Sequence, residues 1–298
     1  MSGRATRDPA PFGHEHRLTM SDALVNSRPI ASRDGTRLHL TEMGDADAAR
    51  TLVVIHGYGE HGGRYVERMK TFTDAGYRVL IPDMRGHGQS EGARGHVMRW
   101  SDYVDDVRAV FGEVATDAGS TGVLGHSNGG LIVAASILAG ATPVAAAALS
   151  SPLLGISVVP PKWKLVGAKV LSRFAPKVSL PSEIDPEVVS HDPDVVATYR
   201  TDPHNHHVNN ARWYTEAVAT MDDAHARAHT IDLPLLVMQA GDDRLVSARA
   251  SAAFADRVPD AVYEEIAGAY HELLFEPDGQ RHADRLLAWF DDHLAGGA

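Results

Sequence analysis

The chain has 298 residues, of which 44% are hydrophobic, and its formal net charge is −11 at pH 7. This length and composition allow a large buried core and are typical of one α/β domain with insertions. The negative charge argues against a nucleic-acid partner, because such proteins carry basic faces that neutralise phosphates. The sequence contains no cysteine, which excludes disulfides and thiolate metal sites.

The first twenty residues mix charges, prolines and glycine, without the apolar stretch of a secretory signal. We predict a flexible extension over residues 1–24 and a cytoplasmic location. Residues 131–149 carry no charge and are about as long as a membrane-spanning helix. Gly140 and Pro143 interrupt this segment, and its two halves have the patterns of a helix and of a strand. We therefore expect no transmembrane helix.

Apolar strand-like runs alternate with helical periodicity along most of the chain, which predicts a mostly parallel sheet with helices on both faces. The expected elements are a hairpin over residues 28–40, strands at 51–57 and 77–83 with a helix at 63–75 between them, a helix at 100–114, a strand at 121–127, a helix at 128–138, strands at 143–152 and 233–243, a helix at 247–258, a strand at 261–266 and a final helix.

The alternation stops between residues 155 and 231, where prolines and short helical fragments replace it. We predict that residues 155–231 form a helical cap, or lid, inserted into an α/β core of residues 25–154 and 232–298. Within the cap, Asp185-Pro186 and Asp192-Pro193 are expected to begin helices, with Asp as the cap residue and Pro in the first helical position.

A G-x-S-x-G motif, Gly125-His126-Ser127-Asn128-Gly129, falls at the expected junction between a strand and a helix. At such a junction a sharp turn strains the serine backbone and lifts its hydroxyl out of the sheet, beside the N-terminus of the helix. Ser127 is therefore the candidate nucleophile, and a purely structural turn is the alternative.

A nucleophilic serine needs a base and a carboxylate that orients the base, in the chain order serine, acid, histidine. Of the 17 histidines, His271 lies in the loop after the last expected strand, although a loop histidine can also have no role. Asp242 and Asp243 both follow the preceding strand, and we favour Asp243 because aspartates commonly form local turns, as we expect of Asp242. Asp83 is a third candidate, but its neighbourhood favours structural pairing with Arg85.

The oxyanion of a tetrahedral intermediate needs N–H donors. The residue after the nucleophile, Asn128, should supply one backbone N–H. The second should come from the loop after the first buried strand, where Gly57 and Gly59 would let the backbone of Tyr58 approach the substrate. The role of the Tyr58 hydroxyl stays open between packing and substrate contact.

Together these segments resemble the α/β-hydrolases, and within them the monoacylglycerol lipase and lysophospholipase group of serine aminopeptidase S33 type. The resemblance covers most of the chain from about residue 28 and rests on the segments HGYGEHGGRY, DMRGHGQSEG, GHSNGG, QAGDDRLV and GAYHELLFE. It implies a catalytic acid at Asp243 and cofactor-free hydrolysis of carboxylic esters through an acyl-enzyme. Monoacylglycerols or similar single-chain lipid esters are the expected substrates, with lysophospholipids or short esters as alternatives and a non-catalytic ligand-binding protein as a remote one.

One cap segment is amphipathic and basic: Trp163, Val166, Val170 and Phe174 recur at helical spacing, and no Asp or Glu occurs between Asp117 and Glu183. We expect Trp163, Val166 and Val170 to line the substrate pocket together with Gly57. The alternatives are that this face simply packs against the rest of the protein, or that it docks transiently on lipid aggregates or a membrane surface.

Three histidines, His204, His206 and His207, lie close together in the cap. Metal-binding histidines need a fixed spacing on a rigid element, and this segment has the composition of a loop. We therefore expect no metal and no other cofactor, and the sequence leaves the oligomeric state open.

Overall fold

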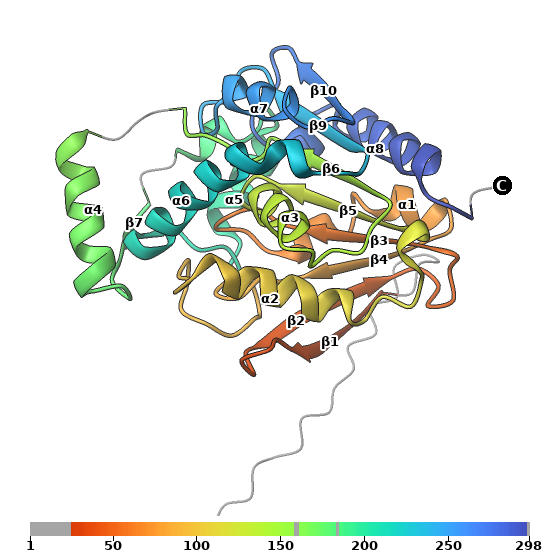
Figure 1. The fold of residues 1–298 in the computed structure, drawn as a ribbon, viewed down its shortest axis with the longest axis horizontal. Helices are drawn as coiled ribbons and strands as arrows, with labels where there is room; N and C mark the ends of the chain where they lie inside the picture. The colour runs from red at the N-terminus through yellow and green to blue at the C-terminus, as the bar shows by residue number, and fades with distance from the viewer. Residues whose placement is uncertain (1–24, 158–160, 183–184, 297–298) are drawn as a thin grey trace, which may run out of the picture.

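The computed structural model describes residues 25–157, 161–182 and 185–296. An eight-stranded sheet runs through the molecule in the order β1-β2-β4-β3-β5-β6-β9-β10 (Figure 1). Its strands are β1 (Val25–Ala31), β2 (Arg37–Met43), β3 (Arg50–Ile55), β4 (Tyr77–Pro82), β5 (Thr121–His126), β6 (Ala146–Ser150), β9 (Leu235–Ala240) and β10 (Ala261–Ile266). β1 and β2 pair antiparallel, β2 also pairs antiparallel with β4, and every other pair is parallel. The predicted mostly parallel sheet is confirmed.

Helices cover both faces of this sheet. The bounds are α1 (Lys70–Asp74) and α8 (Gly279–His293) on one face, and α2 (Trp100–Phe111), α3 (Asn128–Leu138) and α7 (Ala248–Ala255) on the other. Strands β4, β5, β6 and β9 are buried along their whole length. A parallel strand covered on both faces must be apolar throughout, so the continuous apolar runs mark the centre of the sheet.

The uncharged stretch at 131–149 is divided between two elements. Helix α3 ends at Leu138, and strand β6 begins at Ala146. Among the described residues, no helix combines the length and the apolar character that crossing a membrane requires.

The insertion forms a separate layer over the carboxyl ends of the strands. Its elements are α4 (Lys162–Phe174), β7 (Ser179–Pro181), the 3-10 turn η3 (Pro186–Val188), α5 (Pro193–Thr201), β8 (Val208–Asn210), α6 (Ala211–Arg227) and the 3-10 turn η4 (Ala228–Thr230). β7 and β8 pair with each other, outside the main sheet. Asp185 and Asp192 each accept a backbone N–H at the start of a helical turn that begins with proline, as predicted. The limits of the cap, residues 155–231, remain a proposal.

The predicted helix at 63–75 is wrong. The chain forms a 3-10 turn, η1 (Gly62–Tyr65), and resumes helical structure only in α1. Consecutive glycines disfavour a helix, and the side chain of His61 accepts the N–H of Gly63. Arg64 is held by the carboxylates of Glu60 and Glu272, which also fixes this turn.

Candidate active site

Ser127 lies in the turn between β5 and α3, with φ 51° and ψ −115°. A Cβ at Gly125 would lie 2.6 Å from the carbonyl oxygen of Gly129, and one at Gly129 would lie 2.1 Å from the carbonyl oxygen of Ile55. Only glycine fits at these two positions. A positive φ at a serine costs about 1–3 kcal/mol, and the turn is held in part by the Ser127 N–H, which donates to the Ser150 carbonyl at 3.0 Å. The predicted strained turn is confirmed.

His271 and Asp243 meet at the carboxyl edge of the sheet, from the loops after β10 and β9. The distance between His271 Nδ1 and Asp243 Oδ2 is 2.7 Å. The other carboxylate oxygen accepts the backbone N–H groups of Leu245 and Val246 at 2.8 and 2.9 Å. Asp242 is exposed and lies in the turn. Of the two neighbouring aspartates, the structure therefore pairs Asp243 with the histidine.

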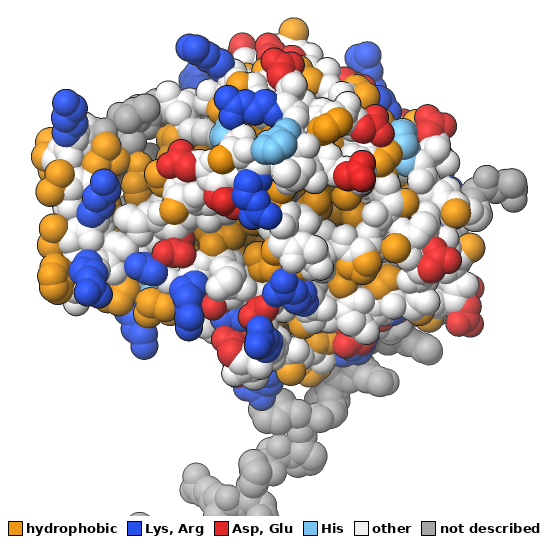
Figure 2. All heavy atoms as spheres, in the orientation of Figure 1, with side chains coloured by type: hydrophobic (Ala, Val, Ile, Leu, Met, Phe, Trp, Pro, Cys, Tyr) orange, Lys and Arg blue, Asp and Glu red, His pale blue; other side chains and the backbone are white. Residues whose placement is uncertain are grey.

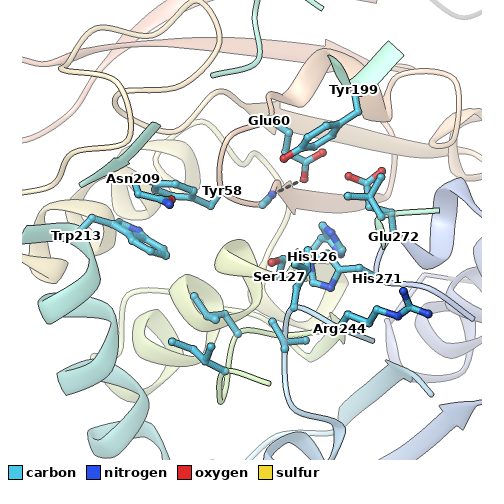
Figure 3. Close-up of a pocket in the computed structure, with 16 residues that line it drawn as sticks. Tyr58, Glu60, His126, Ser127, Tyr199, Asn209, Trp213, Arg244, His271 and Glu272 are labelled. Atoms are coloured by element: carbon cyan, nitrogen blue, oxygen red, sulfur yellow. Dashed lines mark hydrogen bonds between the residues drawn. The ribbon is translucent and has the colours of Figure 1, made fainter. Parts of the chain in front are cut away.

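The protonation of this pair follows from burial and charge. Burial alone would lower the pKa of His271, but the carboxylate of Asp243 and its hydrogen bond raise it by more, so that it lies above its ordinary value. Burial alone would raise the pKa of Asp243, and the charge of His271 outweighs it and lowers the pKa. When Nδ1 donates to Asp243, Nε2 of the neutral imidazole is an acceptor. His271 lines the same cavity as Ser127, and Figure 3 shows the two in one cluster of side chains with His126.

A second imidazole contacts the first. The ring of His126 lies 4.9 Å from that of His271, centroid to centroid. Burial, and then the positive charge that His271 can carry, lower the pKa of His126 to about 4. His126 is therefore neutral at pH 7.

The two predicted oxyanion residues come from the start of α3 and from the loop after β3. Asn128 is the first residue of α3, so its backbone N–H belongs to the helical turn whose N–H groups lack an intrahelical partner. Tyr58 lies in the loop after β3, where Gly59 adopts φ +83°, and it lines the same cavity as Ser127. The Tyr58 hydroxyl donates to the carbonyl of Gly95 at 2.8 Å. It is therefore bound to the protein backbone and has a structural role.

Ser127 and His271 open into a cavity of about 240 Å³ (Figure 3). Tyr58 and Trp213 lie along one side of it. The remaining lining residues are mostly apolar, with a few charged ones: Gly57, Glu60, His126, Leu153, Ile156, Val189, Tyr199, Asn209, Arg244, Leu245, Val246 and Glu272. An apolar pocket with few polar groups suits a hydrocarbon chain joined to a small polar group.

Of the predicted pocket residues, Gly57 lines this cavity and the three α4 residues do not. Trp163, Val166 and Val170 are 71%, 62% and 52% exposed, because α4 lies at the outer edge of the molecule (Figure 1). Helical periodicity identifies an apolar face without saying what covers it. Two cap aromatics do line the cavity, Tyr199 of α5 and Trp213 of α6. The sequence signal for Trp213 is the pair Trp213-Tyr214 early in a helical segment.

A buried ion network beside the cavity was not predicted. Arg64 donates to both carboxylate oxygens of Glu272, at 2.8 and 2.6 Å, and also pairs with Glu60. All three side chains are at most 5% exposed. Glu60 also accepts the N–H of Gly57 at 2.6 Å and the hydroxyl of Tyr65 at 2.8 Å. The network thus joins the loop after β3 to the loop that carries His271.

Two other groups of residues have structural roles. Asp83 accepts the N–H groups of Gly62 and Gln89, whereas Arg85 pairs with Asp106 and Asp34. The predicted pairing of Asp83 with Arg85 is therefore wrong, because each binds other partners.

The histidines of the cap loop do not gather around one point. The imidazoles of His204, His206 and His207 pack against different rings, those of His61, Tyr58 and Tyr199 respectively. Within residues 25–157, 161–182 and 185–296, no three His, Asp or Glu side chains are arranged to hold a metal ion.

The sheet is mostly parallel, a strained serine follows β5, and a histidine–aspartate pair follows the last two strands. These features define the protein as an α/β-hydrolase with the elements of a Ser-His-Asp site. Residues 46–278 match the model of the family described as serine aminopeptidase, S33, and the chain belongs to that family.

Several proteins named as lipases are similar to this chain over most of its length. A monoacylglycerol lipase of Mycolicibacterium smegmatis is 36% identical over 259 residues, which span 84% of this chain and 91% of the relative. The phospholipase YtpA of Bacillus subtilis is 30% identical over 247 residues, or 82% of this chain and 95% of the relative. The crystal structure of Paleococcus ferrophilus monoacylglycerol lipase superimposes with a TM-score of 0.80 at 29% identity and covers 86% of this chain and 99% of that one. The protein is a serine ester hydrolase of the monoacylglycerol lipase-like group.

Proposed function

We propose that the protein hydrolyses monoacylglycerols or similar single-chain lipid esters through an acyl-enzyme on Ser127. The observation that carries the proposal is the His271–Asp243 pair, joined at 2.7 Å beside a strained serine that opens into an apolar cavity. The relatives named monoacylglycerol lipase support the choice of substrate.

In the proposed mechanism, His271 Nε2 takes the proton of the Ser127 hydroxyl as the oxygen attacks the ester carbonyl. Asp243 holds the Nδ1–H and stabilises the imidazolium that forms. The backbone N–H groups of Tyr58 and Asn128 donate to the oxyanion. The tetrahedral intermediate collapses, the C–O bond to the alcohol breaks, and the alcohol leaves with the proton from His271. Water, deprotonated by His271, then attacks the acyl-enzyme and releases the fatty acid.

The cavity supports a single acyl chain. Its apolar side chains include Leu153, Ile156, Val189, Leu245 and Val246, and each CH₂ group transferred to such surroundings contributes about 0.8 kcal/mol. Rates should therefore rise with acyl length until the cavity is filled.

Lysophospholipids are the second candidate substrates. Arg244 lines the cavity and is exposed, so its guanidinium is accessible to a phosphate headgroup. The phospholipase among the relatives fits this alternative.

A substrate profile tests the proposal. Aryl esters of increasing acyl length would be assayed beside a monoacylglycerol and a lysophosphatidylcholine, with Ser127→Ala as the inactive control. We expect medium or long chains to be preferred over acetyl and the monoacylglycerol over the lysophospholipid. A strong preference for acetyl would contradict the lipase assignment, and a preference for lysophosphatidylcholine would favour the second candidate.

We also propose that α4 docks on lipid surfaces. Its apolar side chains are unusually exposed: 71% for Trp163, 62% for Val166, 52% for Val170 and 82% for Phe174. Figure 2 shows hydrophobic side chains among lysines and arginines at the edge of the molecule that α4 occupies. An apolar stripe flanked by basic residues matches a helix that lies in the surface of an anionic bilayer.

A further inference from the structure

The cap touches both residues that are proposed to bind the oxyanion. We infer that Trp213 and His206, which belong to the cap, are positioning residues that hold the oxyanion site in shape. This inference rests on the proposed function, in which the backbone N–H groups of Tyr58 and Asn128 are the donors. It makes the cap part of the catalytic apparatus as well as a cover over the substrate.

The first contact is between two aromatic rings. Trp213 packs against Tyr58 with ring centroids 4.0 Å apart and an angle of 32° between the rings, and Figure 3 shows the two rings side by side. The helix that carries Trp213 is fixed at its start, because Asn210 accepts the N–H groups of Arg212 and Trp213 at 2.9 and 3.1 Å. The side-chain amide of Asn210 also donates to the carbonyl of Val178 at 3.0 Å. The Trp213 ring is thus presented to Tyr58 from an anchored helix end.

The second contact reaches the other donor residue. The indole Nε1–H of Trp213 donates to the side-chain oxygen of Asn128 at 3.3 Å. Asn128 is buried, with 1% of its surface exposed, and begins α3 directly after Ser127. One cap side chain therefore contacts both residues that flank the proposed oxyanion site.

The third contact fixes the backbone after Tyr58. The backbone N–H of His206 donates to the carbonyl of Gly59 at 2.9 Å, and the His206 ring lies 5.1 Å from the Tyr58 ring. Gly59 needs its positive φ of +83°, and a Cβ there would lie 3.0 Å from the His206 carbonyl oxygen. On the core side, Glu60 accepts the N–H of Gly57 at 2.6 Å. The segment from Gly57 to Gly59 is thus held by the core at one end and by the cap at the other.

This support matters because oxyanion donors act only within a narrow geometry. A donor must lie about 2.7–3.1 Å from the position that the oxyanion will occupy, and loss of one donor costs about 10²–10³ in kcat. Displacement of the Tyr58 backbone by a fraction of an ångström would lose part of that factor. The loss would fall on kcat, since the interaction strengthens only in the transition state.

The test compares two tryptophans of the cap. Trp213→Ala, Trp213→Phe and the matched control Trp163→Ala would be assayed on a water-soluble aryl ester, and thermal unfolding would verify the fold of each variant. We expect Trp213→Ala to lower kcat about 10- to 100-fold with KM changed by less than about threefold. Trp213→Phe, which keeps the ring contact and loses the N–H donor, should lose about threefold, and Trp163→Ala should leave kcat unchanged.

A second measurement separates positioning from simple pocket lining. A trifluoromethyl ketone forms an oxyanion-bearing adduct with the serine, so its affinity should fall in Trp213→Ala by the same factor as kcat. A product fatty acid, which forms no oxyanion, should bind within about threefold of wild type. An unchanged kcat in folded Trp213→Ala, or equal losses for both ligands, would overturn the inference. Activity that survives in Ser127→Ala would instead refute the proposed function.

Discussion

Helices α4 and α6 belong to the same insertion and carry the same kind of amphipathic pattern. The apolar side chains of α4 are exposed to solvent, whereas α6 contributes to the cavity. Each has a tryptophan near its start, Trp163 in α4 and Trp213 in α6. Trp163 is exposed, whereas Trp213 lines the cavity and contacts residues on both sides of Ser127. An apolar stripe alone does not say whether a helix covers an active site or presents itself to a lipid surface. In the proposed function the cap does both, because α6 contributes to the cavity and α4 presents its apolar side chains to a lipid surface.

The largest effect should come from the core, with no involvement of either helix. Asp243→Asn replaces the carboxylate that holds the His271 Nδ1–H at 2.7 Å, and an amide there favours the wrong tautomer. We expect kcat on a soluble ester to fall about 10⁴-fold. Asp242→Asn is the matched control, because Asp242 is exposed and does not pair with His271. It should leave kcat unchanged. The opposite ranking would assign the acid to Asp242.

The next largest effect should come from Glu272, which pairs with Arg64 in the buried ion network beside the cavity. Glu272 and Glu60 both raise the pKa of His271, after the larger effects of burial, which lowers it, and of Asp243, which raises it. Because the base must be neutral, kcat/KM of the wild type should fall as the pH drops through a value above about 6.5, the ordinary pKa of imidazole. Glu272→Gln removes one negative charge, so this acidic limb should move to lower pH.

At neutral pH the same variant should lose about tenfold in kcat, in the range of a partly misplaced catalytic group. Glu264→Gln provides the control, since both carboxylate oxygens of Glu264 also contact an arginine, Arg285. Glu264 lies in the edge strand β10 and does not line the cavity. This control should leave both the rate and the acidic limb unchanged. If Glu272→Gln lowers the stability but leaves the acidic limb of the kcat/KM profile at the same pH, the network has a structural role only.

The smallest effect should appear only at an interface. The double variant Trp163→Ala/Phe174→Ala removes the two most exposed apolar side chains of α4. Partial burial of such side chains in a bilayer contributes about 1 kcal/mol, so affinity for anionic phospholipid vesicles should fall about fivefold. The rate on a soluble ester should not change. An equal loss on the soluble ester would place α4 at the active site and would remove the contrast with α6.

Most of the core could be predicted from the sequence because local patterns decide it. The carboxyl ends of parallel strands share one edge of a sheet, so a serine, an aspartate and a histidine that follow three strands must come close together. The strained turn at Ser127 follows in the same way from the glycines on either side, since their positions leave no room for a Cβ.

The remaining features depend on contacts between distant segments. Arg64 and Glu272 are 208 residues apart in the chain, and nothing local indicates that they pair. The same holds for Trp213 and Asn128, 85 residues apart. The predicted helix at 63–75 was wrong for a related reason, because the ion pairs of Arg64 fix a turn that the sequence pattern alone does not indicate.

The central claim is that Ser127 is the nucleophile, and covalent labelling tests it most directly. The native enzyme would be treated with an alkyl fluorophosphonate, followed by intact-mass measurement and peptide mapping. We expect one phosphonyl group per chain, on the peptide that contains Ser127, and no labelling of Ser127→Ala. Undiminished labelling of that variant, or a modified residue elsewhere in the chain, would contradict the account.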